Sequence, residues 1–491
     1  MPLREKIFLL TERLPLTTAA SQSVLLWFRL DLRLGDNAAL AAALATGLPV
    51  IPIFLWDSEH DNAIAPGAAS RWWLHHSLLR LDQSLQTRGS RLIVRRGPSA
   101  LTLAALARET ESARIFCNRV VNPTAPSDTS LAGRLRAEGI SLETCTPSLL
   151  FEPGSIRNTS GGPFQVFTPF WRACLNQRAS IPAPLDPPRQ VPPPLSWPRS
   201  LTVADLDLEP RIDWAAGIRA AWSPGEAAAL SRLQSFRPSL TEYATERDRP
   251  DHEGSSRLSP HLHFGEVSPA RIWHSLAGCP GAEPYLRQLA WREFAHHLLS
   301  EYPHTLQQPF QPQFRHFPWR RNRRLLRAWQ KGRTGYPIVD AAMRELWTTG
   351  WMHNRARMIV ASFLVKHLLI PWQDGAAWFL DTLVDADLAN NTMGWQWVAG
   401  CGVDAAPYFR IFNPVLQGEK FDPQGDYVRR WLPELGALPA EHIHQPWNAP
   451  PLVLTAAGVH LDSNWPLPIV DHAQARAAAL AALSEMKTAA R

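Results

Sequence analysis

The segment from Gly350 to Pro414 concentrates side chains that could perform chemistry together. It holds an Asn-Arg-x-Arg cluster and two acids within stretches whose hydrophobic spacing predicts buried helices. It also holds five tryptophans, Trp351, Trp372, Trp378, Trp395 and Trp397. Burying large, polarizable and redox-active indoles beside Arg and Asp is costly without a ligand, and an ordinary core would use Leu, Ile and Val. The segment therefore predicts a buried ligand site next to redox-active side chains.

One predicted helix in this segment presents three functional groups on the same face. Asn354, Arg357 and Met358 are spaced i, i+3, i+4, so an amide, a guanidinium and a thioether point the same way. A guanidinium on an otherwise buried helix requires an anion, and Asp385 and Asp387 are the candidates. A purely structural ion pair is the alternative interpretation.

A second candidate site is the small-residue loop Glu253–Ser259. Its serine hydroxyls and backbone amides lead into a predicted helix, and such a loop can hold a pyrophosphate. An ordinary helix N-cap would look similar in sequence. Further along, the run Trp319–Arg333 interleaves arginines with aromatic and apolar residues, which suits a phosphate backbone but also an ordinary solvated face.

Trp395 and Trp397 are two residues apart, which separates them by about 200° on a helix. They are therefore expected to serve different surfaces, one an electron path and the other a substrate pocket.

Together with SSRLSPHLHFGE (Ser255–Glu266), LAWREF (Leu289–Phe294) and GRTGYPIVDAAMREL (Gly332–Leu346), the opening segment closely resembles the photolyase/cryptochrome family of flavoproteins. The resemblance runs from about Val24 to Trp447 and is nearest to bacterial cyclobutane pyrimidine dimer photolyases of the class I or class III type. It implies an FAD cofactor. The positions that match the family's cofactor-binding residues are Tyr243, Ser255, Ser256, Arg257, Leu258, Ser259, Arg292, Asn354, Arg357, Asp385, Asp387 and Asn391.

The resemblance also implies roles in electron transfer and substrate binding. Trp395, Trp372 and Trp319 match the photoreducing triad, with Trp395 nearest the flavin. Trp291 and Trp397 match the aromatic walls around a flipped-out lesion, and Gln288, Asn354 and Met358 complete the catalytic set. Asn391 matches the position facing flavin N5, where plant-type cryptochromes have Asp.

Gln288 departs from the dimer photolyases, which carry Glu at this position to hydrogen-bond the dimer carbonyls. Enzymes that repair (6-4) lesions have Gln here, but they also have a second His where this chain has Asn354. We expect a deoxyribodipyrimidine photo-lyase that repairs cyclobutane pyrimidine dimers in DNA by electron transfer from photoexcited reduced FAD. The alternatives are a cryptochrome-like blue-light photoreceptor, a photolyase of altered lesion specificity with weak dimer repair, and a flavin-binding DNA-associated protein without photochemistry.

Composition supports a globular protein of two or three domains, since 491 residues exceed one compact core. A net charge of +6 permits a polyanionic partner such as DNA. No apolar run reaches the roughly 18–20 residues of a membrane span, so no membrane partner is expected. The five cysteines form no C-x-x-C pair, which favours a reducing cytoplasm and predicts neither a disulfide nor a metal site. We expect a monomer.

The order of elements predicts an N-terminal α/β domain with a doubly wound parallel sheet, followed by an all-α FAD-binding domain. Predicted strands are Val24–Phe28, Pro49–Trp56, Leu92–Val94, Arg114–Cys117 and Ser141–Thr144. Met358–Ile370 is apolar nearly all round, which predicts one fully buried helix. The predicted parts are an extension (1–21), the α/β antenna domain (22–150), a proline-rich linker (151–223), the helical domain (224–470) and a terminal helix or tail (471–491).

In the family the α/β domain carries an antenna chromophore, often a folate such as MTHF. Here the loop Cys117–Thr129 lacks the acidic residue expected soon after its Asn. Trp72-Trp73 resembles a folate-stacking site of one bacterial subgroup, although core packing accounts for at least one of the pair. A folate, another antenna or none are all open on these residues.

Overall fold

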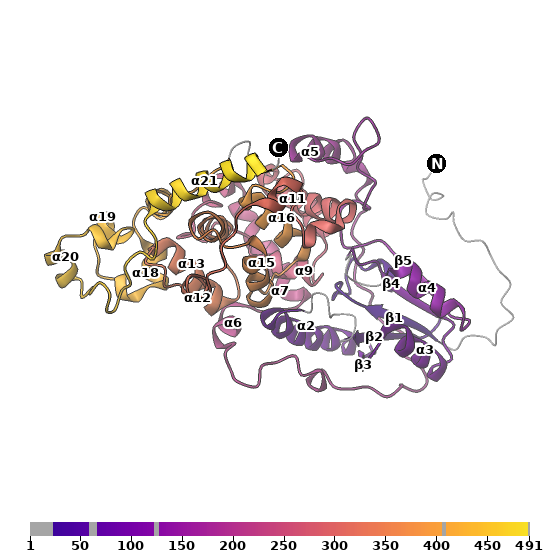
Figure 1. Ribbon diagram of the computed structural model, residues 1–491. Helices are drawn as coiled ribbons and strands as arrows, with labels where there is room; N and C mark the ends of the chain where they lie inside the picture. The colour runs from indigo at the N-terminus through magenta and orange to yellow at the C-terminus, as the bar shows by residue number, and fades with distance from the viewer. Residues whose placement is uncertain (1–22, 58–65, 122–126, 405–408, 490–491) are drawn as a thin grey trace.

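The computed structural model describes residues 23–57, 66–121, 127–404 and 409–489. The extension predicted at residues 1–21 lies outside these ranges. An α/β unit occupies one end of the molecule, and the helices that follow form a larger body beside it (Figure 1). No helix within the described ranges combines the length and the apolar character needed to cross a bilayer.

The α/β domain is built on a five-stranded parallel sheet in the order β3-β2-β1-β4-β5. Its strands are β1 (Val24–Phe28), β2 (Val50–Trp56), β3 (Ile93–Arg96), β4 (Arg114–Asn118) and β5 (Ser141–Cys145). The helices between them are α1 (Ala38–Leu44), α2 (Ala68–Gln86), α3 (Ser99–Glu109) and α4 (Asp128–Arg136). The predicted doubly wound parallel fold is confirmed, with strand ends shifted by one or two residues.

Alternate residues of the strands supply two separate cores. Val24, Leu26 and Phe28 face α1 and α2, whereas Leu25 and Trp27 face α3 and α4. This alternation is the period of two that a sheet covered on both faces requires. Leu79 of α2 is 40% exposed, so it faces solvent rather than the sheet although it is apolar.

The proline-rich stretch 180–200 follows the sheet instead of crossing open solvent. Val191 donates to the carbonyl of Arg88, Val50 donates to that of Pro192, and Leu201 donates to that of Val94 (3.0, 2.9 and 3.0 Å). Proline has no backbone N–H to donate, so this segment covers the edge of the sheet without itself becoming an edge strand on which another strand could pair. The predicted linker (151–223) also contains α5 (Phe167–Asn176) and α6 (Ala216–Ala221), and α5 packs in the core of the helical domain.

The rest of the chain is helical. Its longer helices are α7 (Glu226–Phe236), α10 (Pro269–Leu276), α11 (Ala282–Glu301), α12 (Arg323–Gln330), α13 (Pro337–Thr349), α14 (Asn354–Ser362), α15 (Trp372–Thr382), α16 (Leu388–Ala399), α17 (Pro414–Phe421) and α21 (His472–Ala489). Short helices are α8 (Tyr243–Glu246), α9 (Ser259–His263), α18 (Asp426–Trp431), α19 (Ala440–Ile443) and α20 (Pro451–Ala456). The α-helical domain predicted from the sequence is confirmed.

The predicted single helix Met358–Ile370 is wrong in its geometry, although Ile359–Ile370 is buried as expected. The α-helix α14 ends at Ser362, and Phe363–His367 continue as a π-helical turn. Leu369 then adopts a left-handed conformation with φ of 53°, immediately before Ile370 and Pro371. A residue that precedes proline is disfavoured in the α region, which explains why the helix stops here.

A buried polar network joins the two domains. The indole of Trp73 on α2 donates to Glu266 (3.1 Å), and the other oxygen of this carboxylate binds His261. Glu266 also accepts from the backbone of Gly225 at 2.7 Å. Both Trp72 and Trp73 are buried, so Trp73 performs the packing role that we expected of at least one of the pair.

Candidate active site

A cavity of about 530 Å³ lies within the helical domain. Its walls come from α8, the loop before α9, α11, α14, the connection between α15 and α16, and α16 itself. The volume falls in the range of cofactor and ligand pockets. The cavity therefore gathers segments that are far apart in the sequence around one binding space.

Nearly every site residue predicted from the sequence lines this cavity. The predicted residues along its wall are Tyr243, Ser255, Ser256, Arg257, Leu258, Ser259, Gln288, Trp291, Arg292, Asn354, Arg357, Met358, Asp385, Asp387, Asn391, Trp395 and Trp397. Trp372 and Trp319 do not line it.

The loop Ser255–Ser259 presents backbone amides rather than a helix dipole. Arg257 has a left-handed backbone (φ of 51°), and Leu258 returns to the right-handed region. Such an alternation turns successive N–H groups toward one side and forms an anion-binding concavity. The helix α9 that follows has only five residues and contributes little dipole, so these backbone amides, which the sequence also indicates, are the groups of the loop best placed to bind an anion.

Three side chains of the loop hold its shape. The hydroxyl of Ser256 bonds to that of Tyr285 (2.9 Å), and Ser259 accepts from the indole of Trp351 (3.2 Å). The guanidinium of Arg257 lies over the rings of Trp222 and Trp351, at 4.6 and 4.9 Å from their centroids. These contacts occupy the side chains, so the backbone is left to bind an anion.

Arg357 and Asp385 both line the cavity and form an ion pair there. One guanidinium nitrogen bonds both carboxylate oxygens, at 3.0 and 2.8 Å, and Arg357 Nε donates to the carbonyl of Met352 at 2.8 Å. The Asp385 side chain is only 3% exposed. Of the two acids considered from the sequence, Asp385 is therefore the partner of Arg357.

Asp387 has a different position and other partners. It caps α16 by accepting from the Asn390 amide at 2.8 Å, and it lies 3.2 Å from His296 Nε2. Burial alone would raise the pKa of Asp387, but the charge of His296 and a hydrogen bond from His263 hold it well below the ordinary value. Asp387 thus stays ionised and fixes the start of the helix that carries Asn391.

Amide groups reach the cavity from two helices. Asn391 donates to the carbonyl of Ala376 at 3.1 Å, which fixes the side chain while its oxygen and second N–H stay available. On α14, Asn354 contacts the sulfur of Met358 at 4.0 Å, and both side chains line the cavity. Neutral amides at these places can hydrogen-bond a ring without carrying a net charge.

The α11 wall combines an aromatic plane with an amide. Trp291 stacks on Phe167 of α5, with 3.6 Å between ring centroids and 7° between planes. One turn earlier, Gln288 donates to the Pro284 carbonyl of its own helix at 3.0 Å. The bond to Pro284 leaves the Gln288 oxygen free, while Phe167 holds the Trp291 ring in a defined plane.

Trp395 connects the cavity with the core behind it. Its ring lies 5.0 Å from Phe379 and 6.2 Å from Trp329, and it packs directly against α15 at Gly375. Both Trp395 and Trp397 line the cavity, so the expected assignment of the two rings to separate surfaces holds only in part. The cavity follows α16 far enough around to reach both.

The other two tryptophans of the predicted triad lie outside the cavity. Trp372 is buried one turn before Gly375 on α15, and Trp319 is half-buried against Phe317, at 4.4 Å between ring centroids. The backbone of Arg320, next to Trp319, donates to Leu369 at 2.7 Å, which keeps that segment close to the start of α15.

Several functional positions were missed from the sequence. They are Tyr285 and Asn390, which line the cavity, and Trp329, which contacts Trp395 behind it. Tyr285 lies at i−3 from Gln288 on α11, so helical spacing alone could have found it. No such signal marks Trp329, because it lies within the run Trp319–Arg333, whose arginines indicate an exposed basic surface. In the structure its indole is buried and donates to the Val360 carbonyl of α14 at 3.0 Å.

Comparisons with known proteins agree with this geometry. Residues 24–192 match the DNA photolyase family, and residues 285–485 match the FAD binding domain of DNA photolyase. The chain is 47% identical to a deoxyribodipyrimidine photo-lyase of Agrobacterium fabrum (94% of this chain, 98% of that one). It is 42% identical to cryptochrome-1 of Arabidopsis thaliana (94% and 70%).

Solved structures give the same result. A bacterial class III photolyase from Agrobacterium tumefaciens superposes with a TM-score of 0.92 at 46% identity, covering 96% of this chain and 99% of that one. A Synechocystis cryptochrome superposes with a TM-score of 0.86 at 32% identity, covering 94% and 98%. The chain belongs to the DNA photolyase family, which also includes the cryptochromes. The prediction of an FAD-dependent enzyme of the deoxyribodipyrimidine photo-lyase class is confirmed.

The donors around the cavity fit FAD. The amides of the Ser255–Ser259 loop suit a pyrophosphate, and the Arg357–Asp385 pair with the Asn391 amide suits a ring that offers both donors and acceptors. Tyr243, buried beside Tyr285 at 5.2 Å between ring centroids, lines the same wall.

We expect Asp385→Asn to weaken FAD binding by about 10–100-fold, or about 1.4–2.7 kcal/mol. The amide cannot balance the Arg357 charge, so the guanidinium would leave the position in which it now lines the cavity. The measurement is a fluorescence titration of flavin-stripped protein with FAD. Asp213→Asn, at an exposed ion pair in the segment before α6, is the matched control. Equal affinity in Asp385→Asn and parent would remove the ion pair from the flavin site.

Proposed function

We propose that the protein repairs cyclobutane pyrimidine dimers in DNA, using light absorbed by reduced FAD. One observation carries the proposal: the same cavity joins an anion-binding loop, the Arg357–Asp385 pair and two indole walls, Trp291 and Trp397. The Ser255–Ser259 loop and the Arg357–Asp385 pair would hold FAD, which in its reduced, light-excited form would supply the electron for splitting the cyclobutane ring and would recover it afterwards. The residues of this chain bind, orient and shield the two reacting molecules.

Base flipping explains why an aromatic pocket is needed. A dimer inside the duplex cannot reach a buried cofactor, so it must leave the stack and enter the protein. Trp291, held flat by Phe167, and Trp397 offer faces on which pyrimidine rings can stack. The side-chain amides of Gln288 and Asn354 can then hydrogen-bond the pyrimidine carbonyls.

Asn391 supports repair over signalling. Its amide can hold the flavin ring by hydrogen bonding without supplying a carboxylic proton, which favours the anionic reduced form. Gln288 and the 42% identity to a plant cryptochrome support the second candidate, a blue-light photoreceptor of the cryptochrome kind. A photolyase of altered lesion specificity with weak dimer repair is the third. An antenna such as a folate, a monomeric state and a cytoplasmic location stay predictions.

The first experiment compares lesions directly. Tag-free protein with chemically reduced FAD is mixed with oligonucleotides that carry one cyclobutane dimer or one (6-4) lesion, in blue light and in the dark. We expect loss of the cyclobutane dimer in light only. Flavin-loaded protein that repairs neither lesion would favour the photoreceptor, and repair of the (6-4) lesion alone would change the substrate.

DNA binding should depend on the basic run Trp319–Arg333. Its seven cations are all exposed, on α12 and on the turns beside it. Replacing Arg323 and Arg324 by Gln should lower the slope of log affinity against log salt by about 2, since each lost phosphate contact removes about 0.9. The same change at Arg134 and Arg136, exposed on α4 of the α/β domain, is the control. An unchanged slope would make the run an ordinary solvated face.

Trp395→Phe should separate cofactor priming from repair. We expect photoreduction of oxidised flavin to be lost, because Trp395 is the indole between the cavity and the buried tryptophans. Repair by chemically reduced protein should stay at the parent level, since the dimer takes its electron from the flavin. Absorption spectra during illumination report the first effect and dimer loss the second. Trp214→Phe, at an exposed tryptophan, is the control. Equal photoreduction in Trp395→Phe and parent would show another path.

Gln288→Glu tests the effect of having Gln, instead of the Glu of dimer photolyases, at this position of the cavity wall. A carboxylate cannot donate to the Pro284 carbonyl, so the side chain would leave its present bond and turn into the cavity. There a charge-assisted or protonated hydrogen bond to the dimer would be about twice as strong as a neutral one. We expect the repair yield per absorbed photon to rise or stay equal, with Gln234→Glu on the surface of α7 as control. A clear drop would show a pocket built around an amide and would contradict the assigned substrate.

A further inference from the structure

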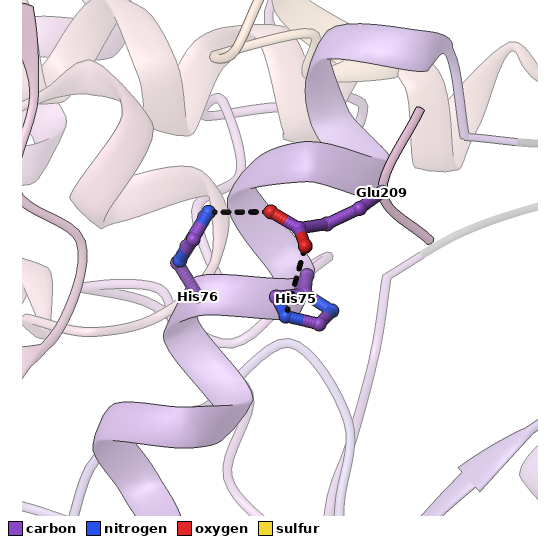
Figure 2. A group of neighbouring side chains, drawn as sticks. All are labelled: His75, His76 and Glu209. Carbon is purple, nitrogen blue, oxygen red and sulfur yellow. Dashed lines mark ion pairs between the residues drawn. The ribbon is translucent and has the colours of Figure 1, made fainter. Parts of the chain in front are cut away.

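Two adjacent histidines on α2, His75 and His76, lie next to Glu209, which belongs to the segment that follows the proline-rich stretch 180–200. His75 Nε2 lies 3.6 Å from Glu209 Oε2, and His76 Nε2 lies 3.1 Å from Glu209 Oε1 (Figure 2). One nitrogen from each ring and one carboxylate oxygen all lie within 4.8 Å of one another. None of these residues belongs to the flavin cavity.

The three side chains are donors of the kinds that a transition metal takes in proteins, namely two imidazole nitrogens and one carboxylate. The His75 side chain is 9% exposed, and its Nδ1 has no hydrogen-bond partner among the described residues.

The three groups are close enough together to share one ion. Zinc binds imidazole nitrogen and carboxylate oxygen at about 2.0–2.2 Å, which places neighbouring ligand atoms about 3.3–3.6 Å apart at the tetrahedral angle. Here each histidine contacts a different oxygen of Glu209, at 3.6 and 3.1 Å, and one ligand atom from each residue lies within 4.8 Å of the other two, so small side-chain rotations would bring them around an ion. Nitrogen donors with one carboxylate favour zinc or a similar first-row ion over magnesium or calcium. The Glu209 side chain is 44% exposed, so solvent can supply the fourth ligand.

We infer that His75, His76 and Glu209 form a binding site for a divalent transition metal, with zinc as the matching ion. No metal site is predicted from the sequence, because Glu209 is far along the chain and adjacent histidines are not a helical metal motif. A bound metal would attach the segment around Glu209 to α2. This segment already packs there, because its Leu206 and Leu208 share a hydrophobic core with Trp72. The role of the metal is to hold the connection between the domains, and it is independent of flavin chemistry.

The test uses tag-free, flavin-loaded protein stripped with a chelator. Zinc is then titrated in competition with a chromophoric chelator, and bound metal is counted by elemental analysis. We expect one tight zinc ion per chain in the parent, and at least tenfold weaker binding in His76→Gln and in Glu209→Gln. His460→Gln, at an exposed histidine elsewhere, should bind like the parent.

A second measurement reports on the proposed role. Zinc should slow proteolytic cleavage within residues 201–215 in the parent and in His460→Gln, but not in the other two variants. The Glu209 side chain is partly exposed, so Glu209→Gln is the variant best able to keep the fold. No tight zinc in the parent, or equal affinity in all four proteins, would overturn the proposal. Dimer repair should be unchanged in Glu209→Gln, which separates this test from that of the flavin site.

Discussion

The ion pair between Arg357 and Asp385 is the interaction on which the site depends. A large cavity lined by charged and polar groups is costly inside a helical domain, and an unpaired guanidinium there would be costlier still. Asp385 precedes α16, and Arg357 is on α14. Their contact therefore sets the distance between the two helices that carry Asn354 and Met358 on one side and Asn391, Trp395 and Trp397 on the other.

Other buried polar groups extend the same arrangement. Asp387 fixes the start of α16 through its cap and through His296, and the Ser256–Tyr285 bond ties the anion-binding loop to α11. Glu266 connects that region to α2 through Trp73. The α/β domain is thus joined to the wall of the cavity by hydrogen bonds and by indole packing, and its own sheet is closed at one edge by the proline-rich segment.

The sequence predicts those parts of the structure that depend on local pattern. The strand Val24–Phe28 appears with the predicted bounds, because its apolar run and the turn residues that follow mark it locally. The site residues could be predicted because each one occupies a position of a family motif. Most of them line the same cavity in the structure.

The rest depends on contacts between distant segments. The π-helical turn at Phe363–His367, the placement of Arg257 between Trp222 and Trp351, and the packing of Trp329 on Trp395 cannot be seen in local spacing. The same holds for Gln288, where the sequence shows the substitution but only the structure shows the bond to Pro284.

The proposed repair requires that the cavity bring a dimer within electron-transfer reach of the flavin. The most direct test is the fluorescence lifetime of protein loaded with reduced FAD, measured with an oligonucleotide that carries one cyclobutane dimer and with the same oligonucleotide undamaged. We expect a shorter lifetime only with the oligonucleotide that carries the dimer, and a smaller change when Trp397 is replaced by Ala. An identical lifetime with both oligonucleotides, at concentrations where both are bound, would contradict it.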